Sequence, residues 1–215
     1  MLQISGLDVH LGHVQVLSDV ELAVPSGQMC GLIGRNGAGK TTLIRTVAGS
    51  LRPSGGSMMF DEVDLAKRPP HHRARLGIGV MPEDRRLVPE LTAEENIMLP
   101  VWATRASEAQ KRLDWIYELM PEVREFRHRG ALQLSGGQQK FVAFARALMA
   151  GTQLLLLDEP SEGIAPAFVQ RMVEILSDLK SAGQSVLLAE SNDAHIAHIL
   201  DATFVIERGS IVETR

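Results

Sequence analysis

Short apolar segments of two kinds follow one another along this chain. Residues 2–33 alternate apolar and polar positions and are interrupted by turn residues such as Pro25-Ser26-Gly27, and a period of two predicts β-strands. Continuous apolar runs at 29–33 and 154–157 predict strands buried on both faces, as in a parallel sheet. Further strands are expected at 57–60, 77–81, 185–189, 203–206 and 210–212, the last two joined at Arg208-Gly209.

Helical periodicity separates these strands in the first half of the chain. A helix over 40–48 would end at Gly49, and Thr92 with Glu95 has the spacing of a capping box that begins another. Helical patterning covers 107–119 and places one apolar stripe on a single face. That stripe consists of Leu113, Ile116, Tyr117 and Met120, and we expect the nearby Trp102 and Trp115 to be packing residues.

The second half of the chain predicts three further helices. Ser135 caps a helix that runs to Ala150, with Gln138 three residues on and Gly151 after it. Pro166 suits the first turn of a helix that ends at about Ser181. Its expected inward residues are Val169, Met172, Val173, Leu176 and Leu179. A last helix is expected over 193–200.

Alternating strands and helices predict a parallel α/β core. We expect 1–215 to form a single domain, with an antiparallel β part at about 1–30 and a helical insertion at about 84–145. The chain has 215 residues, 45% of them hydrophobic. That is enough for one sizeable core and too little for two large domains.

Charge and cysteine content exclude several classes of protein. The formal net charge is −4, whereas proteins that act on nucleic acid usually carry a basic excess, so we expect no nucleic-acid partner. The single cysteine, Cys30, cannot form an intrachain disulfide and is expected in the core. No apolar run is long enough to span a bilayer, and the first residues lack the pattern of a signal peptide. The protein is therefore expected to be soluble or peripheral.

The segment Gly34-Arg35-Asn36-Gly37-Ala38-Gly39-Lys40-Thr41-Thr42 has the pattern of a phosphate-binding loop. Glycines let backbone N–H groups turn toward phosphates, and the following helix adds partial positive charge. Lys40 is expected to reach the β- and γ-phosphates, and the Thr41 hydroxyl to bind Mg²⁺. A glycine-rich turn with a chance Lys-Thr pair is the alternative, which the flanking strand and helix disfavour.

Two carboxylates end the apolar strand at 154–157. Asp158 and Glu159 would lie at the carboxyl edge of the sheet, where α/β proteins bind ligands. Asp158 is expected to hold Mg²⁺, directly or through water, and Glu159 to position or deprotonate a water molecule. An ordinary strand followed by acidic loop residues would be the preferred interpretation without the phosphate loop upstream.

A second glycine-containing segment lies between the two. Leu134-Ser135-Gly136-Gly137-Gln138-Gln139 offers a hydroxyl, glycine N–H groups and a helix N-terminus. It cannot serve a phosphate that residues 34–42 already hold, unless that phosphate belongs to a second subunit. A glycine-containing helix cap is the alternative.

These three segments, in this order, resemble the ATP-binding subunits of ABC transporters over nearly the whole chain. The resemblance implies a P-loop NTPase fold of the ABC ATPase type, with ATP and Mg²⁺ as ligands. It implies that Ser135, Gly136, Gly137 and Gln138 grip the γ-phosphate held by the opposite subunit. The implied partners are a second ABC ATPase, two transmembrane permease subunits and an extracytoplasmic substrate-binding protein, with this chain peripheral on the cytoplasmic face of the inner membrane.

Residues 80–86, 91–97 and 158–166 look like the ATPases of branched-chain amino acid and related polar amino acid or urea/amide uptake systems. In most ABC proteins a Gln stands at the position of Glu83, where it senses Mg²⁺ and the γ-phosphate and links to the membrane subunits. The resemblance implies that Glu83 takes this role.

The chain departs from the wider family pattern at several positions. Leu11 stands where an aromatic usually stacks on adenine; Leu11 can still pack on a purine, and His10 is expected to be exposed. Ser191 replaces a histidine, and Ala165 replaces an aspartate. The chain ends at Arg215, shorter than expected for this family, so we expect a minimal version of it.

Two other classes of function compete with a transporter ATPase. A soluble ABC-type ATPase of DNA repair or translation typically carries a long coiled-coil insertion or two fused halves, and neither is visible. A small-molecule kinase would explain residues 34–42 but not 134–139. Neighbouring genes for multi-span membrane proteins and a secreted binding protein would favour the transporter.

Overall fold

The computed structural model describes residues 1–104 and 108–215, arranged around two β-sheets. Strands β1 (Leu2–Leu11), β2 (Val14–Val24), β4 (Gly55–Phe60) and β5 (Val63–Asp64) form an antiparallel sheet in the order β2-β1-β4-β5. The β part predicted at about 1–30 thus also takes in β4, which pairs with β1 across more than forty residues, and β5, which pairs with β4. Sequence alternation alone cannot reveal such a distant partner.

The second sheet is the central one. It has the order β10-β9-β3-β8-β7-β6, with every neighbouring pair parallel except β9 and β10. Its strands are β3 (Met29–Ile33), β6 (Ile78–Met81), β7 (Leu154–Asp158), β8 (Ser185–Glu190), β9 (Ala202–Glu207) and β10 (Ser210–Thr214). The predicted, mostly parallel sheet is therefore confirmed, and the carboxyl ends of β3, β7 and β8 meet at one edge.

Successive leucines of β7 face two different cores. Leu154 and Leu156 pack in one hydrophobic cluster with Leu43 of α1 (Lys40–Val47), between the two sheets. Leu155 and Leu157 pack in the other cluster, beneath α6 (Gly136–Ala150) and α7 (Pro166–Ser181). All four leucines have no exposed surface, which is why the sequence shows a continuous apolar run instead of an alternation.

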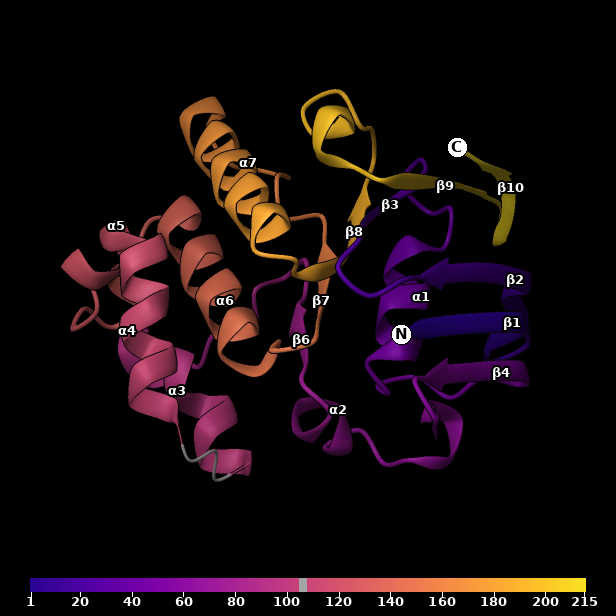
Figure 1. The fold of residues 1–215 in the computed structure, drawn as a ribbon, viewed down its shortest axis with the longest axis horizontal. Helices are drawn as coiled ribbons and strands as arrows, with labels where there is room; N and C mark the ends of the chain where they lie inside the picture. The colour runs from indigo at the N-terminus through magenta and orange to yellow at the C-terminus, as the bar shows by residue number, and fades with distance from the viewer. Residues whose placement is uncertain (105–107) are drawn as a thin grey trace.

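The remaining helices gather on the side opposite the antiparallel sheet (Figure 1). They are α3 (Ala93–Thr104), α4 (Ala109–Leu119) and α5 (Pro121–Glu125), which pack against α6, while the short α2 (His72–Arg75) lies before β6. The described residues also contain short 3₁₀ turns at Leu65–Lys67, Ala131–Gln133 and Ala197–Ile199. None of the helices in the described residues is long and apolar enough to cross a membrane.

Both predicted capping boxes are confirmed. The Thr92 N–H donates to Glu95 Oε2 at 2.8 Å, and the Glu95 N–H donates back to Thr92 Oγ1 at 3.2 Å. At the start of α6, the Ser135 N–H donates to Gln138 Oε1 at 2.9 Å and the Gln138 N–H donates to Ser135 Oγ at 3.2 Å. Each box satisfies N–H groups that a helix leaves unpaired.

The predicted helix over 193–200 is wrong. The segment is a turn followed by the 3₁₀ turn Ala197–Ile199, because the Asn192 side chain accepts the Ala194 N–H at 3.2 Å and competes with a regular first turn. Part of another prediction, the helical residue Ser107, lies outside the described residues, and α4 begins at Ala109.

Two side-chain predictions also need correction. In α7 the buried stripe is Met172, Ile175, Leu176 and Leu179, spaced i, i+3, i+4 and i+7, while Val169 and Val173 are only half-buried beside it. Trp102 is 55% exposed instead of packed. Trp115 does pack, with the Arg112 guanidinium 4.0 Å above its ring, and Cys30 is buried as expected.

Candidate functional site

The loop of residues 34–39 turns tightly between β3 and α1. A Cβ added to Gly34 would lie 2.3 Å from the Ile206 carbonyl oxygen, so the loop approaches β9 too closely for any side chain. Gly39 has φ +113°, in the region that favours glycine, and leads directly into α1. Gly34 is therefore required by close packing against β9, and Gly39 by its backbone conformation.

The N-terminus of α1 has no side-chain cap and no acidic residue in its first turn. Its N–H groups and the positive end of the helix dipole are thus directed at the loop, an arrangement suited to an anion. Arg35 and Gly37 are exposed in the loop, whereas Ala38 is buried beneath it.

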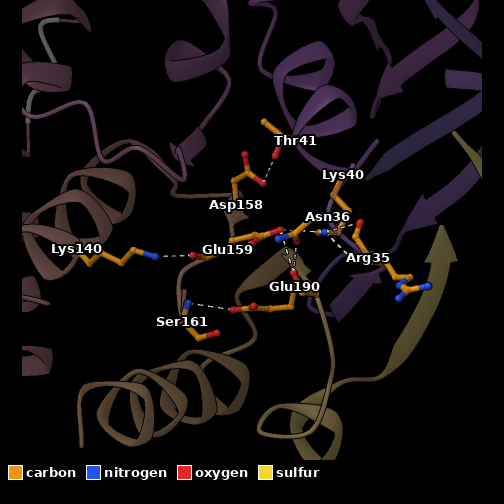
Figure 2. Close-up of polar contacts among 11 residues, drawn as sticks. Arg35, Asn36, Lys40, Thr41, Lys140, Asp158, Glu159, Ser161 and Glu190 are labelled. Carbon is orange, nitrogen blue, oxygen red and sulfur yellow. Dashed lines mark hydrogen bonds and ion pairs between the residues drawn. The ribbon is translucent and has the colours of Figure 1, made fainter. Parts of the chain in front are cut away.

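Lys40 is 3% exposed and turns its ammonium group inward (Figure 2). Its Nζ donates to the carbonyl oxygens of Gly34 at 2.6 Å and Arg35 at 3.2 Å. The same Nζ lies 2.9 Å from Glu159 Oε1, forming a buried ion pair. The phosphate loop and the acidic end of β7 are therefore joined directly through this lysine.

Asp158 ends β7 and is 1% exposed. The Thr41 hydroxyl donates to its Oδ1 at 3.1 Å. Burial, with the nearby negative charges of Glu83 and Glu159, raises the pKa of Asp158 to about 6, and the Thr41 hydrogen bond only partly opposes this. A cation beside Asp158 and Thr41 would offset that electrostatic cost, and oxygen donors of this kind suit Mg²⁺.

Glu159 follows in a left-handed backbone conformation, with φ +46°. Its N–H donates to the Ala189 carbonyl oxygen of β8 at 2.9 Å. Burial favours a raised pKa for Glu159, but hydrogen bonds from Glu162 and Lys40 outweigh it and lower the pKa. The hydrogen bond to Glu159 and the negative charge of that carboxylate conversely raise the pKa of Glu162.

Ser191 connects the two halves of the site. Its hydroxyl lies 2.7 Å from Asn36 Oδ1 and 3.3 Å from Glu159 Oε1. A side chain after β8 thereby reaches both the phosphate loop and the carboxylate after β7. Ala165, at the other departure from the family pattern, caps α7 through its backbone only.

A cleft of about 320 Å³ lies between these groups. It is lined by Val16, Asn36, Gly37, Gly39, Lys40, Thr41, Thr42, Glu83, Glu159 and Glu162. The predicted residues from three separate segments are thus brought together. Leu11 is 44% exposed at the end of β1 and does not line the cleft, where Val16 of β2 does instead; His10 is exposed as expected, and its Nδ1 lies 2.8 Å from Ser54 Oγ.

Residues 134–139 lie apart from the cleft, at the N-terminus of α6. Ser135 and Gly136 are exposed. Gly137 lies against Phe168 of α7: a Cβ added to Gly137 would be 3.1 Å from the Phe168 ring. None of Ser135, Gly136, Gly137 or Gln138 lines the cleft. Any phosphate that they contact is therefore a different one from that held beside Lys40.

Two buried charged residues of the site escaped the sequence analysis. Lys140, 3% exposed, donates from Nζ to the Glu159 carbonyl oxygen at 2.6 Å. Glu190, 5% exposed, accepts the Ser161 N–H on Oε1 at 3.0 Å. The sequence held one signal for both: Lys140 directly follows segment 134–139, and Glu190 ends the apolar run 185–189. A charged residue in a buried element is seldom without a partner, so each could have been expected to contact the site.

The arrangement can bind a phosphate chain, hold a cation beside it and orient a water molecule toward it. Among the described residues no group of three or more His, Cys, Asp or Glu side chains could hold a metal ion by itself. A divalent ion here would therefore share Asp158 and Thr41 with oxygens of a bound phosphate.

Comparisons with known protein sequences agree with this chemistry. A family model described as ABC transporter matches residues 17–162. The high-affinity branched-chain amino acid transport ATP-binding protein BraG of Pseudomonas aeruginosa is 38% identical over 212 residues, 99% of this chain and 91% of that protein. The lipopolysaccharide export system ATP-binding protein LptB of Escherichia coli is 34% identical over 200 residues, 92% of this chain and 83% of that protein.

Solved structures have the same fold. A nucleotide-free ATP-binding cassette from an ABC transporter superposes with a TM-score of 0.86 at 25% identity, over 100% of this chain and 90% of that one. The dimeric bacterial ABC transporter cassette MJ0796 gives a TM-score of 0.88 at 22% identity, over 100% and 98%.

Proposed function

The chain belongs to the ABC transporter family as an ATP-binding, ATP-hydrolysing subunit, and from this premise we propose that it energises a bacterial importer of branched-chain or related amino acids, urea or amides. The similarity to BraG over 99% of the chain carries the proposal. A probable branched-chain amino acid transport ATP-binding protein, LivF of Archaeoglobus fulgidus, adds support at 29% identity over 98% of the chain.

Export of a lipid-linked substrate is the second candidate. It is favoured by LptB of Haemophilus influenzae, which is 35% identical over 93% of this chain. The difference of a few per cent in identity makes the importer the better supported candidate. The two differ in their partners, since only an importer needs an extracytoplasmic substrate-binding protein.

Nucleotide binding begins with an exchange of partners at Lys40. The ammonium group leaves Glu159, 2.9 Å away, and binds the β- and γ-phosphates, while N–H groups at the start of α1 bind the same phosphates. The freed Glu159 carboxylate then faces the end of the phosphate chain. Binding of ATP and exposure of the proposed base are thus one event.

Asp158 and Thr41 are the proposed protein ligands of Mg²⁺, with Glu83 beside them in the cleft. Their fit rests on the buried carboxylate, whose pKa is raised by burial and by the negative charges of Glu83 and Glu159. When bound, the ion would neutralise charge that develops on the phosphate oxygens.

Glu159 is the proposed catalytic residue. Lys40, when bound to phosphate, no longer pairs with its carboxylate, so Glu159 can accept a hydrogen bond from a water molecule and orient it in line with the γ-phosphate. Ser191 holds Asn36 of the phosphate loop at 2.7 Å and so keeps the loop beside this carboxylate.

Segment 134–138, in which Ser135 and Gly136 are exposed, is proposed to bind the nucleotide of a second ABC ATPase, because its donors lie outside this chain's own cleft. A groove of about 470 Å³ between the core and the helical part is the proposed contact with transmembrane permease subunits. Pro82, Arg86, Leu99, Pro100 and Ala103 line it. The chain would then be peripheral at the cytoplasmic face of the inner membrane.

The nucleotide site is tested with Lys40→Ala. Loss of a charge-assisted contact should weaken binding of a fluorescent ATP analogue by about tenfold or more. Lys67→Ala is the matched control, since Lys67 is 82% exposed and pairs with Asp64 outside the cleft. Unchanged affinity in Lys40→Ala would refute the phosphate-loop assignment.

The transport role is tested by purifying the tagged chain from membranes of its own host in mild detergent. We expect two multi-span permeases and a related ATPase to co-purify, and the associated binding protein to bind a branched-chain amino acid, a related polar amino acid, urea or an amide. Recovery of lipopolysaccharide export components instead would favour the second candidate.

A further inference from the structure

The side chain of Lys140 passes from the helical part of the chain into the active-site region (Figure 2). Lys140 lies on α6, two residues after Gln138, and donates to the Glu159 carbonyl oxygen at 2.6 Å. Burial lowers the pKa of Lys140, whereas the negative charges of Glu190 and Glu162 act in the opposite direction. A buried cation with this desolvation cost requires partners that are fixed in place.

Glu190 holds the other end of the same short turn. Its carboxylate accepts the Ser161 N–H at 3.0 Å, while Lys140 holds the carbonyl group two residues before. Pro160 lies between them, has no N–H and has a fixed φ. The peptide groups on both sides of Pro160 are therefore held by oppositely charged buried side chains, one from α6 and one from β8.

The turn needs such restraint because Glu159 is left-handed, with φ +46°. This conformation is unfavourable for a non-glycine residue and persists only where surrounding contacts impose it. One such contact is to β8: the Glu159 N–H donates to the Ala189 carbonyl oxygen at 2.9 Å. Lys140 adds a restraint from α6, the helix whose first turn carries segment 134–138.

We propose that Lys140 is a positioning residue that couples α6 to the turn formed by residues 159–161, and thereby couples the segment facing a second subunit's nucleotide to this chain's own catalytic carboxylate. The inference rests on the proposed role of Glu159 in hydrolysis. Ser135 and Lys140 are five residues apart on a rigid helix, about 7 Å along its axis. A shift of α6 when segment 134–138 engages nucleotide therefore moves the Glu159 carbonyl group as well.

The test separates positioning from stability through the pair Lys140 and Glu190. Lys140→Met keeps the length of the side chain but leaves Glu190 buried without its counter-ion, so both the melting temperature and turnover should fall. Adding Glu190→Gln removes the buried charge while its amide oxygen can still accept the Ser161 N–H. We expect Lys140→Met/Glu190→Gln to regain a near wild-type melting temperature, yet to keep kcat at least about tenfold below wild type.

Two further variants complete the experiment. All variants are measured by phosphate release with Mg²⁺ and ATP and by titration with a fluorescent ATP analogue. Lys111→Met, on the exposed side of α4, should behave as wild type. Lys140→Arg should restore most of kcat, because it keeps a cationic donor. In the double variant the affinity for the ATP analogue should stay within about twofold of wild type, because Lys140 does not touch the phosphate loop.

Recovery of kcat together with the melting temperature in the double variant would overturn the proposal, since Lys140 would then act on stability alone. A parallel loss of nucleotide affinity would overturn it as well. Glu159→Gln distinguishes failure of the Glu159 proposal from failure of the Lys140 proposal. Near-normal turnover of Glu159→Gln would refute the proposed function of Glu159. An inactive Glu159→Gln together with a fully active Lys140→Met/Glu190→Gln would refute only the role of Lys140.

Discussion

A single hydroxyl proton limits what Ser191 can do in the site. The hydroxyl can donate one hydrogen bond, and Asn36 Oδ1 at 2.7 Å is closer than Glu159 Oε1 at 3.3 Å. The Ser191 proton therefore goes mainly to the phosphate loop. A serine is also shorter than the histidine that the wider family carries, and it stays neutral near pH 7.

Ser191→Ala should consequently change turnover of the assembled complex by less than about threefold, or under about 1 kcal/mol in the barrier. Glu159→Gln, measured in parallel, should abolish turnover because the proposed base is lost. Steady-state phosphate release compares the two. A collapse of activity in Ser191→Ala would mean that the hydroxyl, or a water molecule that it binds, replaces the missing imidazole.

Residues of the site could be predicted where their type and spacing carry the chemistry. The run from Gly34 to Thr42 and the pair Asp158-Glu159 need particular residues in order, so sequence alone located them. Val16 enters the cleft through the pairing of β2 with β1. Glu190 reaches the Ser161 N–H because β8 lies between β3 and β7. Such neighbours come from tertiary structure and leave no local pattern.

Asp201 joins three elements at the end opposite the cleft. Its Oδ2 accepts the Met29 N–H at the start of β3 at 2.8 Å, and its Oδ1 lies 2.7 Å from Lys180 Nζ of α7, just before β9 begins. The hydrogen bond from Lys180, followed by that from Met29, lowers the pKa of Asp201 below its ordinary value of 3.8. The folded state thus favours the charged form.

Asp201→Asn should lower the free energy of unfolding by about 1 kcal/mol at pH 7, since the pair is partly exposed and solvent screens it. A depressed carboxyl pKa gives stability that is fully present above pH 3.8 and is lost as the pH falls through the lower folded-state pKa. Urea titrations should therefore converge for variant and wild type in strong acid. Asp178→Asn, exposed on α7, is the control, and a gap that persists unchanged in acid would contradict the assignment.

The contact between β6 and α6 depends on a missing side chain. A Cβ on Gly79 would lie 2.0 Å from the Ala147 carbonyl oxygen and 2.7 Å from the Gly151 N atom, both backbone atoms that cannot move aside. The strand and the end of the helix are therefore in direct backbone contact. Any substitution must push α6 away from the sheet.

Gly79→Ala should destabilise the protein by roughly 2–3 kcal/mol, as overpacked cores do. Gly130→Ala is the matched control: an added Cβ there meets nothing closer than 3.9 Å. Chemical denaturation measures both variants. Equal stability of the two would show that β6 and α6 adjust freely, contrary to this packing.

Elements with a strong period were predictable, and those without one were not. The apolar stripe of 107–119 and the capping box at Ser135 gave α4 and α6 nearly at their observed bounds, and the capping box at Thr92 gave the start of α3. The segment 193–200 has apolar residues at helical spacing, but only a 3₁₀ turn forms there. The Asn192 side chain binds the start of the segment. After its end, the Asp201 N–H donates to the Met29 carbonyl oxygen at 2.8 Å and returns the chain to β3. Tertiary contacts decided that case.

At the scale of the whole molecule, the donors of segment 134–138 and the cleft lie on different parts of one chain. Two copies, or two related chains, can bring each segment to the other's cleft only by pairing. Strands far apart in the sequence lie next to one another in the order β10-β9-β3-β8-β7-β6. The spatial separation of segment 134–138 from the cleft therefore could not be inferred from the spacing of the motifs in the sequence. The expectation of a second subunit came from the chemistry of the segment together with the family resemblance.

Glu159→Gln should therefore accumulate as an ATP-bound dimer, because it binds ATP without hydrolysing it. Size-exclusion chromatography with ATP and Mg²⁺ should show a shift to twice the monomer mass for this variant and a mainly monomeric wild type. Glu174→Gln, on the exposed face of α7, is the control. A monomeric Glu159→Gln that binds ATP would count against pairing between copies of this chain and favour a different ATPase as the partner.

The buried ion pair between Lys40 and Glu159 makes ATP binding a substitution reaction. The ammonium group has three oxygen partners before any phosphate arrives, so the measured affinity reports the difference between two sets of partners rather than the strength of either. When the products leave, Lys40 pairs with Glu159 again. The empty loop is then not left with a buried, uncompensated positive charge. A site of this kind holds ATP less tightly than its phosphate contacts alone would allow, because Glu159 competes with the phosphates for Lys40.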